Sequence, residues 1–136
     1  MDTSETYIEQ CEKATKLQKE WKPKFGDRIK EGFISRIYIN GDIGFVTTGG
    51  EGRISRELAI CIFSQDQLQE MVLKIGNHPW SLFWDIEDWL SKIAGDSYEY
   101  INVNKIPFTS MEQLWLAFVM SELYSRRWDG NDWIII

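Results

Sequence analysis

Three carboxylates in the second half of the chain, Asp85, Glu87 and Asp88, are of the type that could hold a divalent cation for phosphodiester chemistry. Asp85 and Asp88 are three positions apart, so on a helix they share a face. Asp88 and Lys92 stand at i,i+4, however, which is the pattern of a solvated helix surface. We expect the solvated surface and keep a metal-dependent phosphoesterase or nuclease as an alternative function.

His78 is the only histidine, and it stands between Asn77 and Pro79 in a predicted turn. Metal sites and histidine-based catalysis draw on several ligands at defined spacings, so we expect a surface turn rather than a nucleophile pair with Cys61. The Gly-rich stretch at residues 47–53 lacks the Gly-Lys-Ser/Thr ending of a phosphate loop and is interpreted as a hairpin tip. We expect no catalytic residue, no resident metal and no cofactor.

Four of the seven tryptophans, Trp80, Trp84, Trp128 and Trp133, lie near predicted turns or away from the main apolar stripes, and we single out Trp84, Trp128 and Trp133. Exposed tryptophan is enriched where proteins bind one another, so these residues are candidates for contact with a partner. The alternative, which a small α+β domain favours, is that they seal the edges of the core.

The net charge of −6 is unevenly distributed along the chain. Residues 1–63 hold ten basic and ten acidic side chains, whereas residues 64–136 hold five basic and eleven acidic ones. The acidic half repels nucleic acid and anionic membranes, and it leaves an acidic decoy that mimics DNA as a third function. A basic stretch with Trp21 and Phe25 interleaved could contact single-stranded nucleic acid, but neighbouring carboxylates neutralise it. Its basic residues are Lys16, Lys19, Lys22, Lys24, Arg28 and Lys30. We therefore expect a protein partner and argue against nucleic acid.

Two distant cysteines, Cys11 and Cys61, indicate a reducing compartment and free buried thiols, with a single disulfide left open. The acidic, polar amino terminus does not resemble a secretory signal. The longest fully apolar run, Leu114–Met120, is too short to cross a bilayer. We expect a soluble, cytoplasmic protein.

The element that must organise the chain is the stretch Ser110–Tyr124. Ser110 and Gln113 have the spacing of a capping box, and no Gly or Pro follows within the stretch. Its consecutive apolar residues leave no polar face, which is the pattern of a buried helix. We expect the other segments to cover it.

The remaining elements give an α+β fold in a single domain. An amino-terminal helix lies within residues 1–25, a small antiparallel β-sheet within 26–63, and a mainly helical half around the central helix within 64–136. The expected helices are 3–21, 64–75 and 82–93, and the expected strands are 33–39, 43–48 and 58–63, with an edge strand at 134–136. Turns are expected at 40–42 and 128–133, and a mobile tip at 49–52. Residues 96–109 are expected to form a loop with a short strand at 98–103.

Two stretches, Gln65–Met71 and Ser110–Met120, resemble uncharacterised small proteins encoded by phages and prophages of Gram-positive bacteria. The patterns Trp21-x-Pro23-x-x-Gly26-Asp27 and Trp128-Asp129-Gly130-x-x-Trp133 extend the resemblance over most of the chain. The resemblance implies a phage or prophage origin and a bacterial cytoplasm, and it carries no activity. We therefore expect a non-catalytic accessory protein that binds another protein.

Overall fold

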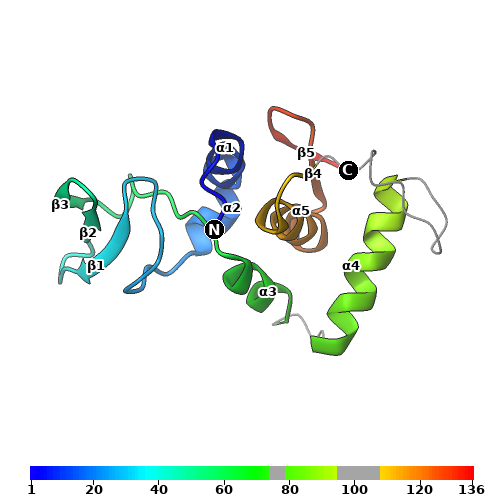
Figure 1. The fold of residues 1–136 in the computed structure, drawn as a ribbon, viewed down its shortest axis with the longest axis horizontal. Coiled ribbons are helices and arrows are strands. Elements are labelled where there is room, and N and C mark those ends of the chain that lie inside the picture. The colour runs from blue at the N-terminus through cyan, green and yellow to red at the C-terminus, as the bar shows by residue number, and fades with distance from the viewer. Residues whose placement is uncertain (74–78, 95–107) are drawn as a thin grey trace. The chain divides into compact units, whose positions relative to one another are not determined.

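The computed structural model describes residues 1–73, 79–94 and 108–136 (Figure 1). The fold is α+β, as predicted. Its elements are α1 (Glu5–Lys13), α2 (Thr15–Glu20), β1 (Phe33–Ile37), β2 (Ile43–Thr47), β3 (Gly50–Ile54), α3 (Gln65–Leu73), α4 (Pro79–Ala94), α5 (Met111–Tyr124), β4 (Arg126–Trp128) and β5 (Trp133–Ile135).

The chain divides into two compact units. The first comprises Met1–Ser64 with Asp129–Trp133, and the second comprises Gln65–Trp128 with Ile134–Ile136. The short strand predicted at 98–103 lies outside the described residues.

The helix predicted over residues 3–21 is wrong as a single element, because it breaks at Ala14 into α1 and α2. Ala14 adopts φ −78° and ψ 63°, although no Gly or Pro is near. In a continuous helix the carbonyl of Cys11 would accept from the N–H of Thr15. Here it accepts from the N–H of Ala14 at 3.2 Å and from the Nε2 of Gln18 at 2.9 Å, so a buried side chain supplies one of its two hydrogen bonds.

The same Gln18 amide pairs with the backbone of Cys61. Its Nε2 donates to the Cys61 carbonyl at 2.8 Å, and its Oε1 accepts from the Cys61 N–H at 2.9 Å. Cys61 lies opposite Ile29 in an isolated antiparallel bridge, whose two hydrogen bonds are donated by Lys30 and Ile62. The polar groups of Cys61 therefore point away from Ile29, and Gln18 satisfies them inside the core.

The sheet of the first unit is an antiparallel meander in the order β1-β2-β3. The predicted turn at residues 40–42 is confirmed. Gly41 has φ +91°, which suits glycine, and the N–H of Asp42 donates to the Oδ1 of Asn40 at 3.1 Å.

The mobile tip predicted at 49–52 and the strand predicted at 58–63 are wrong. The third strand is the Gly-rich β3, which pairs with β2 along its length. Gly52 lies opposite Phe45, and a Cβ on Gly52 would come within 2.4 Å of the Phe45 ring. The glycine is therefore a packing position under an aromatic ring. The 58–63 stretch contributes only the bridge at Cys61.

The second unit contains the predicted central helix, α5. The hydroxyl of Ser110 accepts from the N–H of Gln113 at 3.1 Å, which confirms the predicted cap. Trp115–Met120 are all buried, as predicted for a helix without a polar face. Helix α3 packs against α5, and Trp89 of α4 meets Phe118 edge to face at 5.4 Å between ring centroids.

Helix α5 ends at Ser125, which has φ 53° and turns the chain into a short hairpin. Arg126 and Arg127 therefore lie in β4 rather than at the end of the helix. The edge strand predicted at 134–136 is present one residue earlier, as β5.

The Gln18 contacts predict a large loss of stability on substitution. Gln18→Met keeps the length of the side chain but removes three buried hydrogen bonds to backbone groups. At about 1–3 kcal/mol for each buried group left unpaired, we expect the free energy of unfolding to fall by about 3–5 kcal/mol. Urea denaturation measures this. Lys19→Met at the adjacent exposed position is the control, and equal midpoints for the two variants would contradict the role given to Gln18.

Candidate functional site

The carboxylates Asp85, Glu87 and Asp88 all lie on α4. The Oδ2 of Asp88 pairs with the Nζ of Lys92 at 3.1 Å, with the two side chains 53% and 74% exposed. Over residues 1–73, 79–94 and 108–136, no group of three His, Cys, Asp or Glu residues is placed to hold a metal ion. His78 lies outside these ranges. The interaction that the structure gives Asp88 is that of a solvated helix surface.

Cys11 and Cys61 are both free and buried. Burial raises the pKa of the Cys11 thiol to about 12, although hydrogen bonds with the backbone of Phe63 and the side chain of Tyr7 act in the opposite direction. The thiolate is the reactive form of cysteine, so Cys11 is a core residue with little nucleophilic character.

The basic stretch near the amino terminus does not present Trp21 for stacking on a base. Trp21 is buried, and its Nε1 donates to the Oδ2 of Asp27 at 2.9 Å. Phe25 is exposed, whereas Lys30 pairs with Glu12 at 3.6 Å. One of the two interleaved aromatic rings therefore belongs to the core.

The three candidate tryptophans lie in different elements and differ in exposure. Trp84 on α4 is 57% exposed, and Trp128 in β4 is half-buried. Trp133 in β5 is buried, and its Nε1 donates to the carbonyl of Gln10 at 2.9 Å. The ring of Trp133 therefore lies in the core and its polar edge is satisfied there, which is the environment expected of a tryptophan that seals the core.

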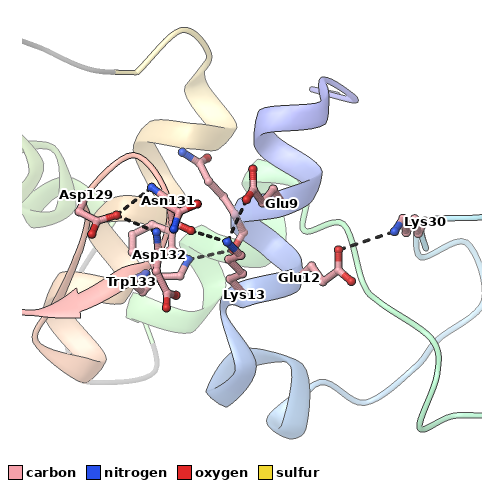
Figure 2. Close-up of polar contacts among 9 residues, drawn as sticks. Glu9, Glu12, Lys13, Lys30, Asp129, Asn131, Asp132 and Trp133 are labelled. Atoms are coloured by element: carbon pink, nitrogen blue, oxygen red, sulfur yellow. Dashed lines mark hydrogen bonds and ion pairs between the residues drawn. The ribbon is translucent and has the colours of Figure 1, made fainter.

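A polar cluster holds the turn before Trp133 on α1 (Figure 2). The Nζ of Lys13 pairs with the Oε1 of Glu9 at 2.9 Å and donates to the carbonyl of Asn131 at 2.5 Å. The hydrogen bond with Glu9 raises the pKa of Lys13. Asp129 Oδ1 accepts from the N–H of Asn131 at 2.8 Å, so the turn is tied both to itself and to the helix. The cluster serves to place Trp133.

A further surface, not indicated by the sequence, lies on the β1–β3 sheet. The cross-strand pairing places Arg28, Phe33 and Val46 in one row, and Arg36, Gly44 and Arg53 in the next. Partners directly across the strands share a face of the sheet. We call the side chains gathered there the arginine–aromatic face, and its members are Arg28, Phe33, Arg36, Tyr38, Val46 and Arg53.

Each arginine of this face lies over an aromatic ring. The guanidinium carbon of Arg28 is 4.9 Å from the centroid of Phe33, and those of Arg36 and Arg53 are 5.6 Å and 3.7 Å from the centroid of Tyr38. These are cation–π distances, which hold the guanidinium groups in defined positions.

The arginine–aromatic face is the solvated side of the sheet. Phe33 is 47% and Val46 is 38% exposed; on the other side Ile34 and Ile43 are buried, and Ile37 at the end of β1 is 44% exposed. A register shift between Ile34 and Arg36 puts Arg36 on the same side as Phe33, although simple alternation would separate them. This shift is why the pattern of alternating residues did not reveal the face.

Comparison with protein-family models, curated proteins and solved structures finds no match to this chain. None of the helices within the described ranges has the length and apolar character needed to cross a membrane.

Trp133 and Trp84 form a matched pair for a stability test. Trp133→Phe removes a buried donor and leaves space in the core, so we expect a loss of about 1–3 kcal/mol in the free energy of unfolding. Trp84→Phe changes a largely exposed ring, and we expect an effect within about 0.5 kcal/mol. Thermal and urea unfolding of both variants measure the difference, and similar losses would contradict the assigned burial.

Burial of Cys11 predicts a loss of stability at alkaline pH. The pKa of the Cys11 thiol is about 12 in the folded protein and lower in the unfolded chain. The free energy of unfolding is therefore undiminished below the pKa of the unfolded thiol and decreases as the pH rises from there toward 12. Relative to Cys11→Ala, we expect the wild type to lose about 1.5 kcal/mol between pH 8 and pH 10. Urea unfolding at the two pH values tests this, and parallel pH dependence in both proteins would refute it.

Proposed function

We propose that this chain is a non-catalytic accessory protein of phage or prophage origin that acts in the bacterial cytoplasm by binding another protein. The observation that carries the proposal is the arginine–aromatic face, where exposed apolar and arginine side chains lie together on one sheet. Aromatic residues and arginine are the types enriched at the energetic centres of protein interfaces. The phage origin is supported by the resemblance of residues 65–71 and 110–120.

The exposed apolar residues of this face give a partner something to bury. Phe33 and Val46 are cross-strand neighbours, and both retain more than a third of their surface in water. Covering them removes apolar area from water, which is the main favourable term in protein association. The cation–π contacts already restrict the arginine side chains, so less conformational entropy is lost when a partner binds.

Trp84 is a second candidate contact, since it is the most exposed of the three predicted tryptophans. Acidic side chains adjoin it on α4, and Asp85 and Asp88 are both exposed. Trp84 is a single exposed ring among carboxylates, whereas the sheet presents several apolar and arginine side chains together. We therefore propose the sheet as the primary contact and treat Trp84 as a separate position to be tested.

Site-specific photo-crosslinking tests the proposal. A photoreactive phenylalanine analogue at position 33, expressed in a Gram-positive host, should yield a discrete protein adduct because this side chain lies at the centre of the proposed contact. The same analogue at Lys19, which is exposed on α2, is the matched control, and position 84 tests the second candidate. Excess unlabelled wild-type protein should suppress the adduct from position 33. Absence of an adduct, or the same adducts from positions 33 and 19, would overturn the proposal.

A further inference from the structure

We infer that the arginine–aromatic face receives an extended acidic polypeptide segment of the partner. This inference rests on the proposed function and adds the chemistry of the bound segment. Three observations carry it: the unpaired charge of two arginines, the spacing of the rows that bear them, and the apolar surface between them.

Two guanidinium groups on the face are available to carboxylates. Within the described part of the chain, neither Arg28 nor Arg36 forms an ion pair with a carboxylate. Arg36 is exposed and lies against Tyr38, whereas Arg28 is half-buried against Phe33. The Nε of Arg28 is buried without a hydrogen-bond partner among the described residues, so its terminal amino groups are the donors left for a ligand. A planar guanidinium binds a carboxylate through two parallel hydrogen bonds, so each arginine matches one acidic side chain.

The spacing of the rows fits an extended segment. Val46 and Gly44 occupy the two rows on β2 and are two residues apart, which corresponds to about 6.8 Å along a strand. Side chains at positions i and i+2 of an extended peptide have the same separation. Two carboxylates with that spacing can therefore reach both rows, and an apolar side chain two positions before or after the pair points to the same side and can cover Phe33 and Val46.

The charges around the face favour a polypeptide over nucleic acid. Asp42 pairs with Arg53 at 3.0 Å, and Glu51 stands opposite Val46 in the first row. These carboxylates neutralise part of the face, so they disfavour a ligand that is charged at every unit, such as a phosphate backbone, more than a polypeptide that carries two carboxylates at the positions of Arg28 and Arg36. Nucleic-acid binding gains its affinity from many phosphate contacts, whereas Arg28 and Arg36 provide two.

Fluorescence anisotropy on the full chain tests the inference. The probes are a labelled twelve-residue peptide with the repeat Glu-Ser-Glu-Ser-Leu-Ser, which places both Glu and the Leu on one side of an extended chain, its counterpart with Gln in place of Glu, and a twelve-nucleotide oligothymidylate. We expect the acidic peptide to bind and the glutamine peptide to bind at least tenfold more weakly. Raising sodium chloride from 50 mM to 300 mM should weaken binding, because the contact is charged.

Variants locate the contact on the face. The double variant Arg28→Ala with Arg36→Ala should weaken binding of the acidic peptide by about tenfold or more. Lys22→Ala with Lys24→Ala removes the same charge from exposed positions outside the face and should change binding less than twofold. Arg28→Lys with Arg36→Lys keeps the charge but removes the planar fork, so we expect an intermediate loss. Circular dichroism checks that each variant is folded.

Several results would overturn the inference. They are no binding of the acidic peptide, equal binding by the Arg28→Ala/Arg36→Ala variant, or tighter binding of the oligothymidylate with the same arginine dependence. The last result would assign the face to nucleic acid. If position 33 still yields a protein adduct and the arginine substitutions do not change it, the proposed protein binding stands. That result would overturn only the inference that the bound segment is acidic. Absence of that adduct would remove the proposed function itself.

Discussion

In the first unit, the side-chain amide of Gln18 makes the hydrogen bonds that a neighbouring β-strand would otherwise make to Cys61. It donates to and accepts from the backbone of Cys61, and it also donates to Cys11. Buried backbone groups must find partners, and the bridge with Ile29 leaves those of Cys61 directed away from it. One glutamine thereby connects α2, the end of α1 and the segment after the sheet. At the break in the helix the Cys11 carbonyl accepts from both the Ala14 N–H and the Gln18 side chain.

The parts of the fold that could be predicted from sequence are those with local causes. Helix α5 follows from a capping serine, the absence of Gly and Pro, and an unbroken apolar run, all of which lie within the helix. The hairpin turn at 40–42 likewise depends on Asn40, Gly41 and Asp42 alone. In both places the residues that determine the conformation are the residues that adopt it, so periodicity and turn chemistry were sufficient.

The parts that could not be predicted depend on tertiary contacts and on strand register. Gly52 is suited to a strand because Phe45 lies over it, and glycine in isolation indicates a turn. Trp133 is buried because its indole N–H meets the carbonyl of Gln10, 123 positions earlier in the chain. The residues next to Trp133 in the sequence are typical of an exposed turn. Gln10 and Trp133 share no window of sequence, and Gly52, although only seven positions after Phe45, is placed against the ring by the pairing register of β2 and β3, which local patterns do not specify.

The arginine–aromatic face shows the same limit at the candidate site. Strict alternation along Phe33–Ile37 would place Phe33 and Arg36 on opposite sides, and the apolar and basic residues would not meet. The register shift after Ile34 brings them to one side, while Ile34 and Ile37 keep to the other. A bulge is a property of the pairing between two strands, since the extra residue exists only relative to a partner. Surfaces created by a bulge therefore become visible once the partner strand is known, which is why this face emerged from the register of β1 and β2 and not from the sequence of β1.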